Sequence, residues 1–248
     1  MGLTLHYTLY SPGRTSRDEA RYLVEQLRAK AQELPFRLVT KVFELEGEAC
    51  EFEHGRKDVP LPVLLAGGRY LEQGEENWVS VPPTGMVAFL ISVGEGCEPA
   101  VLGLARYPDF VVAPNGERME TDLAGWSWQS FCKTQYASNP KIGGQENFLR
   151  CHLNLIKLLD FGQSLGLVDE VRDEGEYWEH RDLTRLCDKL HEYNALIAGF
   201  AGKLKDQMQI EAPITAFPNF EHLEAKGQAM WGDREEDFNE SDEPGISS

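Results

Sequence analysis

The sequence lacks the features of several large protein classes. It has no apolar run of the length, about 18 residues, that can cross a membrane, and its most hydrophobic stretch is 86–93. Its start, MGLTLH, has neither the basic region nor the long apolar region of a secretory signal. Basic residues are scarce, because 24 Lys and Arg stand against 41 Asp and Glu, which gives a net charge of -17. We therefore expect a soluble, cytoplasmic protein whose partners include neither a membrane nor nucleic acid.

Cysteines are also few, and their arrangement excludes a disulfide framework. The 5 cysteines are odd in number and widely spaced, and no two form a CxxC pair; they are Cys50, Cys97, Cys132, Cys151 and Cys187. This pattern favours reduced thiols in a cytosol. Cys187 and His191 share a helix face, and Cys151-His152 could lie nearby, but structural zinc needs more ligands at short spacing. We therefore predict no metal and no cofactor.

What the sequence does contain is an ordinary globular composition, with 42% hydrophobic residues in a chain of 248, enough for a substantial core. Residues 3–10 alternate apolar and polar side chains, which predicts a strand. Ser16 and Glu19 form a capping-box pattern that opens a helix to about Glu33. A second alternating stretch, 36–45, completes a βαβ-like opening unit.

The middle of the chain is punctuated by turn residues. Glycines and prolines recur at short intervals through 46–85, which predicts a long, loop-rich excursion. The continuous apolar run 86–93 is typical of a strand that is covered on both faces. Two short strands are expected at 101–106 and 110–113, and Pro114-Asn115-Gly116 is expected to form a turn after them.

The second half repeats the strand-helix-strand order. Alternation predicts a strand over 126–137, and helical spacing predicts a helix from about 145 to 165, closed by Gly166. A short strand follows at 167–171. Asp182 can cap a long helix that runs to about Lys205. Residues 228–248 are strongly acidic and are expected to form a solvated, mobile tail.

These elements predict an α+β fold, with a mixed or antiparallel sheet and long helices packed mainly on one face. We expect a single domain over 1–227 and an acidic flexible tail over 228–248. The repeated element order leaves open two sub-halves, 1–113 and 114–227, that resemble ferredoxin-like strand-helix-strand units. This resemblance concerns topology and implies no function.

Candidate catalytic residues come from the two later helices and the strand before them. His152 lies in the middle of an apolar helical arc, and Asn194 interrupts another apolar stripe, so both need buried polar partners. Together with Cys132 they have the residue types of a thiol nucleophile, its base and the group that orients the base. However, Cys132 has no electropositive setting in the sequence. An interior hydrogen-bonded network is therefore the favoured interpretation.

Two other segments carry weaker signals. The loops after the predicted strands at 3–10 and 126–137 offer free amides and a base ahead of a helix, so Arg14, Thr15 and Ser16, and separately Lys141, are candidate anion-binding residues. Neither loop matches a known phosphate-binding pattern, and helix capping is the simpler explanation. The connection 173–182 mixes carboxylates, His and aromatic residues, and could perform acid–base chemistry if one carboxylate were buried.

No candidate catalytic set outweighs its structural explanation. The sequence thus favours a non-catalytic binding or interaction protein whose partner is a protein or a small molecule. One alternative is a hydrolase-like enzyme for a small or anionic substrate, which requires Cys132, His152 and Asn194, or the 173–182 connection, to converge in an open cleft. A third hypothesis is an acidic inhibitor of a basic partner, based on the net charge alone. The oligomeric state stays open.

Overall fold

The computed structural model describes residues 3–12, 14–51, 57–73, 77–208 and 212–228. Its centre is a 7-stranded sheet with the order β11-β1-β10-β7-β6-β2, in which β3 also pairs with β6. All of these pairings are antiparallel. The strands are β1 (Thr4–Ser11), β2 (Leu38–Val39), β3 (Phe43–Glu46), β6 (Gly85–Ser92), β7 (Ala100–Arg106), β10 (Trp126–Lys133) and β11 (Val168–Asp173).

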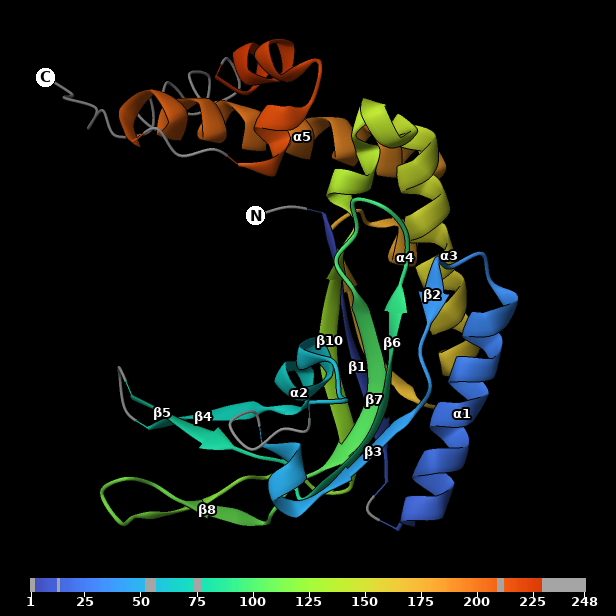
Figure 1. Ribbon diagram of the computed structural model, residues 1–248, viewed down its shortest axis with the longest axis vertical. Helices are drawn as coiled ribbons and strands as arrows, with labels where there is room; N and C mark the ends of the chain where they lie inside the picture. Colours follow the sequence, from blue (N-terminus) through green and yellow to red (C-terminus); the bar gives the residue numbers. More distant parts are fainter. Residues whose placement is uncertain (1–2, 13, 52–56, 74–76, 209–211, 229–248) are drawn as a thin grey trace, which may run out of the picture.

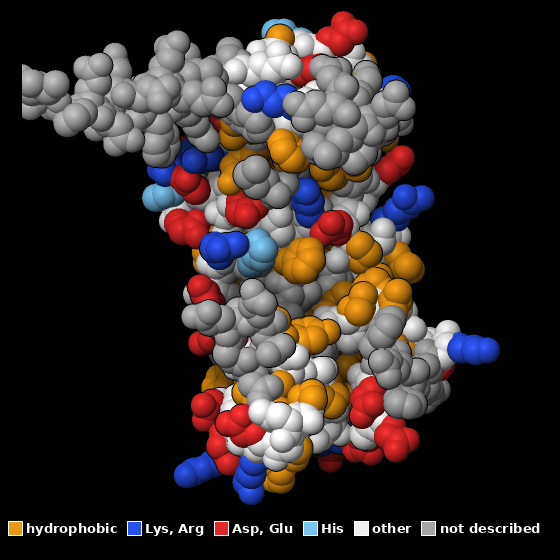
Figure 2. Space-filling view, turned by 90° about the vertical axis from the view of Figure 1, so that its left-hand side faces the viewer, with side chains coloured by type: hydrophobic (Ala, Val, Ile, Leu, Met, Phe, Trp, Pro, Cys, Tyr) orange, Lys and Arg blue, Asp and Glu red, His pale blue; other side chains and the backbone are white. Residues whose placement is uncertain are grey.

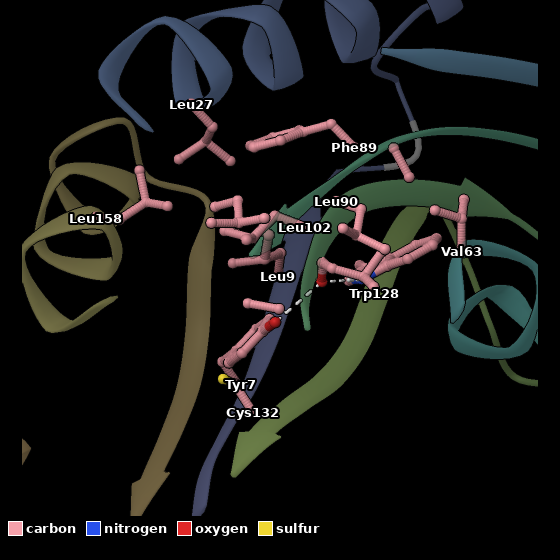
Figure 3. Packing of buried hydrophobic residues seen from close by; sticks show 14 of the residues in the cluster. Tyr7, Leu9, Leu27, Val63, Phe89, Leu90, Leu102, Trp128, Cys132 and Leu158 are labelled. Atoms are coloured by element: carbon pink, nitrogen blue, oxygen red, sulfur yellow. Dashed lines mark hydrogen bonds between the residues drawn. The ribbon is translucent and has the colours of Figure 1, made fainter. Parts of the chain in front are cut away.

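The two faces of this sheet differ in their cover. The long helices α1 (Arg17–Glu33) and α3 (Gly144–Ser164) pack on one face (Figure 1). Leu27 of α1 and Leu158 of α3 are fully buried above the sheet (Figure 3). On the other face, the short helix α2 (Leu61–Gly67) packs against β6, β7 and β10. The predicted α+β class, with the long helices on one face, is confirmed.

The remaining elements are smaller additions and a C-terminal helical layer. Two hairpins consist of β4 (Arg69–Gln73) with β5 (Asn77–Val81), and of β8 (Phe110–Val112) with β9 (Arg118–Glu120). After β11 come α4 (Tyr177–His180), α5 (Leu183–Met208) and a helical segment over 220–228. A Cβ on Gly227 would lie 1.9 Å from the Ala195 carbonyl oxygen of α5, so this helix crossing requires glycine. Short 3-10 helices span Gly47–Cys50, Gln135–Ser138, Pro140–Ile142 and Pro213–Ala216.

The strand order interleaves the two predicted sub-halves. β1 lies between β10 and β11, the two strands that flank α3, and β10 lies between β1 and β7. Strands from 1–113 and 114–227 therefore alternate in one sheet. Here α3 connects β10 and β11, and the antiparallel strand β1 lies between them. This arrangement is the split β-α-β pattern of ferredoxin-like sheets.

Several sequence predictions need correction in their details. The stretch 36–45 is not one strand but two, β2 and β3, and it lies at the sheet edge away from β1, so there is no adjacent βαβ pair. The break occurs at Thr40, whose hydroxyl accepts the N–H of Leu90 at 2.9 Å and replaces a main-chain contact. The region 46–85 contains α2 and the β4–β5 hairpin in addition to loops. The apolar residues 63–66 of this region lie in the middle of α2.

The strand predicted over 126–137 is also shorter than expected. β10 ends at Lys133, and the chain then turns into the 3-10 helix Gln135–Ser138. The turn is held by the Gln135 side chain, whose Oε1 accepts the N–H of Leu3 at 3.1 Å. Such a side-chain contact competes with strand extension but leaves no trace in the alternation pattern.

The sheet is not continuous between β7 and β10. These strands pair only at Trp126 and Ser127, and then diverge. In the gap, the Val101 carbonyl of β7 accepts two side-chain hydrogen bonds, from Trp128 Nε1 at 2.9 Å and from Tyr7 Oη at 3.0 Å (Figure 3). Both donors are almost completely buried. They therefore replace the backbone N–H group that a neighbouring strand would otherwise donate to this carbonyl.

This shared acceptor predicts a non-additive effect on stability. Tyr7→Phe and Trp128→Phe each leave Val101 with one donor, and we expect each hydrogen-bond loss to cost about 1 kcal/mol. The double variant leaves a buried carbonyl without a donor, so its loss should exceed the sum of the two single losses by about 1–2 kcal/mol. Urea unfolding of the four proteins measures this coupling.

Tyr10→Phe is the matched control, because the Tyr10 ring is 38% exposed. It should change the unfolding free energy by less than about 0.5 kcal/mol. Strict additivity of Tyr7→Phe and Trp128→Phe would show that the Val101 carbonyl does not depend on these donors.

Candidate functional site

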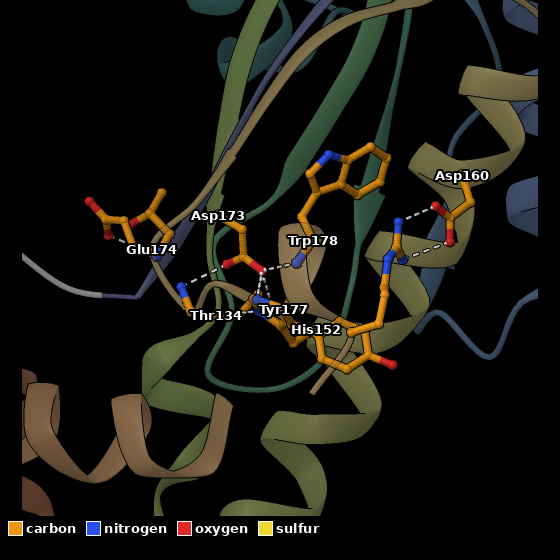
Figure 4. A network of polar contacts seen from close by, with 10 residues as sticks. Thr134, His152, Asp160, Asp173, Glu174, Tyr177 and Trp178 are labelled. Atoms are coloured by element: carbon orange, nitrogen blue, oxygen red, sulfur yellow. Dashed lines mark hydrogen bonds and ion pairs between the residues drawn. The ribbon is translucent and has the colours of Figure 1, made fainter. Parts of the chain in front are cut away.

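His152 is completely buried in α3 and has a polar partner on each ring nitrogen. Its Nδ1 lies 3.0 Å from the Thr134 hydroxyl, and its Nε2 lies 3.2 Å from Asp173 Oδ2. Asp173 also accepts the backbone N–H groups of Gly175, Tyr177 and Trp178 at 2.8–3.0 Å (Figure 4). The interior network predicted for His152 is therefore present, and its acid comes from the connection 173–182.

The protonation state of Asp173 is set by competing effects. Burial by itself raises the pKa of this carboxyl group. The hydrogen bond and charge of His152 and the N–H groups of Gly175 and Trp178 outweigh burial, so the pKa of Asp173 is lowered. Asp173 is thus a stable carboxylate that anchors the turn after β11, rather than a proton donor.

Asn194 belongs to a second buried network. Its Oδ1 accepts a hydrogen bond from Gln135 Nε2 at 2.9 Å, and its Nδ2 donates to Ser138 Oγ at 3.1 Å. The Ser138 hydroxyl in turn donates to the Gln135 carbonyl at 2.7 Å. This network joins α5 to the segment that follows β10.

Cys132, the third candidate of the catalytic set, belongs to neither of these two hydrogen-bonded networks. Its thiol donates to the Glu98 carbonyl at 3.2 Å, and burial raises the pKa of this thiol, so it stays protonated. Among the hydrogen bonds of the described residues, none joins two of Cys132, His152 and Asn194. The structure therefore does not bring these residues together in one open cleft.

A different thiol pair was not visible in the sequence. The side chains of Cys97 and Cys151 influence each other's ionisation: their interaction lowers the pKa of Cys151 and raises that of Cys97. Arg150 Nη2 lies 3.7 Å from the Cys151 sulfur. The two cysteines are far apart in the chain, so no local spacing could reveal this pair. All five cysteines are free thiols.

The predicted anion-binding residues lie at opposite ends of the sheet. Ser16 caps α1 and forms the predicted capping box with Glu19, whose pKa is lowered by the Ser16 backbone and hydroxyl hydrogen bonds. The Thr15 hydroxyl lies 2.7 Å from that of Ser11, and Arg14 is exposed. Lys141 is exposed near the other end of β10, in a turn held by Asn139. The two loops are therefore separate candidate sites, and anion binding at either loop stays a prediction.

The charged residues of the connection 173–182 form ion pairs along the surface. Glu176 contacts Arg185 and Lys189, and Arg181 forms a two-pronged contact with Asp160 at 2.7 and 3.0 Å (Figure 4). The pKa of Glu176 is lowered by these cations, first by Lys189. Such contacts order the chain between β11 and α5. Of the described carboxylates of the connection, Glu174 lines a hollow on the surface of the sheet.

The uncovered part of the sheet forms a better candidate site. Opposite the α1–α3 layer, side chains of β11, β1 and β10 face outward in register. The central row consists of Arg172, His6 and Phe131, which are direct neighbours across the three strands. Glu170, Thr8 and Gln129 form the row on one side of it. We call this surface the open face; Figure 2 views the molecule from this side, where hydrophobic, basic, acidic and His side chains gather.

The open face is hollowed around Phe131, which is 53% exposed. A hollow of about 460 Å³ lies over the central row and the row of Glu170, Thr8 and Gln129, and another of about 300 Å³ extends toward Lys133 and Glu174. A third, of about 310 Å³, lies between Phe131 and α2. Because Phe131 lines all three, they form one groove that is polar over β1 and β11 and apolar beside α2.

Arg69 lies at the apolar end of this groove. Its Nη1 donates to the carbonyls of Ala66 and Gly68 at 3.2 and 3.0 Å, and its guanidinium lies 5.4 Å from the Tyr107 ring centre. Its Nη2 is buried without a hydrogen-bond partner. Burial lowers the pKa of Arg69, but a guanidinium stays charged at neutral pH. Such a ring contact contributes about 0.5–2 kcal/mol, less than the several kcal/mol that burial of an unpaired charge costs.

Comparison with protein-family models, with curated proteins and with solved structures found no match for this chain. Within the described residues, no three His, Cys, Asp or Glu side chains are grouped to hold a metal ion. Nor does any helix in the described ranges have the length and apolarity needed to cross a bilayer. The site must therefore be interpreted from its own geometry.

The Asp173 network predicts a pH-dependent stability. Because its pKa is lowered in the folded state, the Asp173 carboxylate stabilises the protein above its usual pKa of 3.8, and this contribution is lost as the pH falls below that value. Asp173→Asn should therefore lose about 3 kcal/mol at neutral pH, and the difference from the wild type should shrink as the pH falls below 3.8. Urea unfolding across this pH range measures both effects.

Asp169→Asn provides the control, since Asp169 is exposed on the same strand. Its unfolding free energy should stay within about 0.5 kcal/mol of the wild type at every pH. A deficit in Asp173→Asn that does not change with pH would contradict the assignment of a charged carboxylate.

Proposed function

We propose that this protein is a binding protein that takes a small ligand in the groove on the open face. The observation that carries the proposal is the meeting of three hollows at the half-exposed ring of Phe131. Ligand sites are typically concave and mainly apolar, with a few polar groups that orient the ligand. Here the apolar wall is α2, and the orienting groups come from β1, β10 and β11.

The surroundings of the polar side chains in the groove and in the core support binding without catalysis. The only imidazole that lines the described groove is His6, which lies 3.8 Å from Glu174 and 5.9 Å from the Phe131 ring centre. Among the hydrogen bonds and ion pairs of the described residues, none joins His6 to a hydroxyl or a thiol, and its one ion pair is with Glu174. The buried His152 and Asn194 are occupied by their own networks. The free thiols support the further proposal of a reducing, cytosolic compartment.

Removal of the Phe131 ring should weaken binding. We expect a fragment library of aliphatic and aromatic acids, alcohols and amines to give ligands with millimolar or better affinity for the wild type. Phe131→Ala should reduce their affinity about tenfold, because the ring supplies contact area to all three hollows. Isothermal titration and ligand-observed NMR measure the affinities.

Phe110→Ala is the matched control, because Phe110 is 41% exposed but lies on β8, outside the groove. It should leave the affinities unchanged. The proposal fails if the library yields no ligand, or if every ligand binds Phe131→Ala as tightly as the wild type.

A further inference from the structure

The third hollow of the groove has one unusual feature, a largely buried cation in a mainly apolar place that also includes Gln129 and Ser130. Its wall is formed by Pro62, Leu65 and Ala66 of α2, by Pro99 before β7 and by Phe131 of β10. Arg69, the first residue of β4, also lines it. The rim carries one carboxylate, Glu98, which is exposed and makes no ion pair with Arg69.

The contacts of Arg69 leave its charge without a counter-ion. Its two hydrogen bonds go to backbone carbonyls, of Ala66 and Gly68, and both use Nη1. The buried Nη2 has no partner, and no carboxylate in the described part of the chain pairs with this guanidinium. Charged groups in protein interiors are normally paired, and arginine is well suited to hold a carboxylate by two parallel hydrogen bonds.

We propose that the hollow between α2 and Phe131 binds a small organic acid, whose carboxylate pairs with Arg69 and whose apolar body lies against α2. The inference rests on the proposed function and names the ligand class of the same groove. In the complex, the half-buried Arg69 side chain turns its free N–H group toward the carboxylate. A single cation beside the acidic Glu98 favours a singly charged carboxylate over a doubly charged phosphate.

The apolar part of the ligand follows from the wall. Leu65 is 57% exposed and Phe131 is 53% exposed, and both line the hollow. A ligand with a short alkyl chain or a phenyl ring would cover these side chains, and apolar burial would add to the ion pair. The neutral alcohol of the same carbon skeleton would gain the apolar contact alone. This difference provides the test.

The experiment compares octanoate with octan-1-ol, and 3-phenylpropionate with 3-phenylpropan-1-ol, by isothermal titration on the full chain. The wild type should bind each acid at least about tenfold more tightly than its alcohol, as expected for a hydrogen-bonded charge pair. Arg69→Gln should remove this preference but leave the affinity for the alcohols within about twofold. Arg69→Lys, which keeps the charge but not the two-pronged geometry, should keep part of the preference.

Arg106→Gln is the matched control, because Arg106 is exposed at the end of β7 and lines none of the three hollows. It should keep the full preference for acids. Circular dichroism and urea unfolding establish that each variant is folded. If Arg69→Gln does not fold, Arg69→Lys and the wild-type comparison of acid with alcohol still test the proposal.

Three results would overturn the inference. The acids and alcohols could bind the wild type equally, the preference could survive in Arg69→Gln, or it could be lost in Arg172→Gln instead, which would place the carboxylate over the central row. In each of these cases, Phe131-dependent binding of any ligand would still support the proposed function. If no compound binds in a Phe131-dependent manner, both proposals fail together.

Discussion

The divergence of β10 from β7 is the constraint on which the rest of the structure depends. After two residue pairs these strands separate, and the Val101 carbonyl is satisfied by Tyr7 and Trp128 instead of a neighbouring backbone. The same Val101, together with Ser130 of β10, lines the hollow that contains Arg69. A continuous sheet would leave no depression there. The core contact at Val101 and the groove on the surface of the sheet therefore both result from the same departure from regular strand pairing.

The polar interior has a different task, which is to attach the C-terminal helices to the sheet. Asp173 gathers one imidazole and three backbone N–H groups where β11 ends, and Asn194 connects α5 to the segment after β10. A buried polar network is stable only when all its members are satisfied, so it specifies one arrangement of these elements. His152 and Asn194, which the sequence marked as candidate catalytic residues, thus have structural roles.

Sequence alone predicted the parts of the fold that depend on local pattern. The strand at 3–10, the helix with its Ser16 cap and the long helix around His152 follow from periodicity within one element. The groove could not be predicted, because His6 and Phe131 become neighbours only through strand pairing across more than a hundred residues. Arg69 lies in a region predicted as loops, where its burial has no local signal. The partner of His152, Asp173, lies in the connection 173–182, where the sequence shows several carboxylates but does not indicate which of them is buried.

The alternation of β1, β10 and β11 has a consequence for how this molecule can change over time. Along each strand, one set of positions supports the core and the other set faces the groove. Substitutions such as those at His6, Gln129 or Arg172 would alter the lining without touching the packed interior beneath. The two sets of side chains are therefore under separate selective pressures. Ligand selectivity can change during evolution through the groove positions, while the core positions keep the same fold.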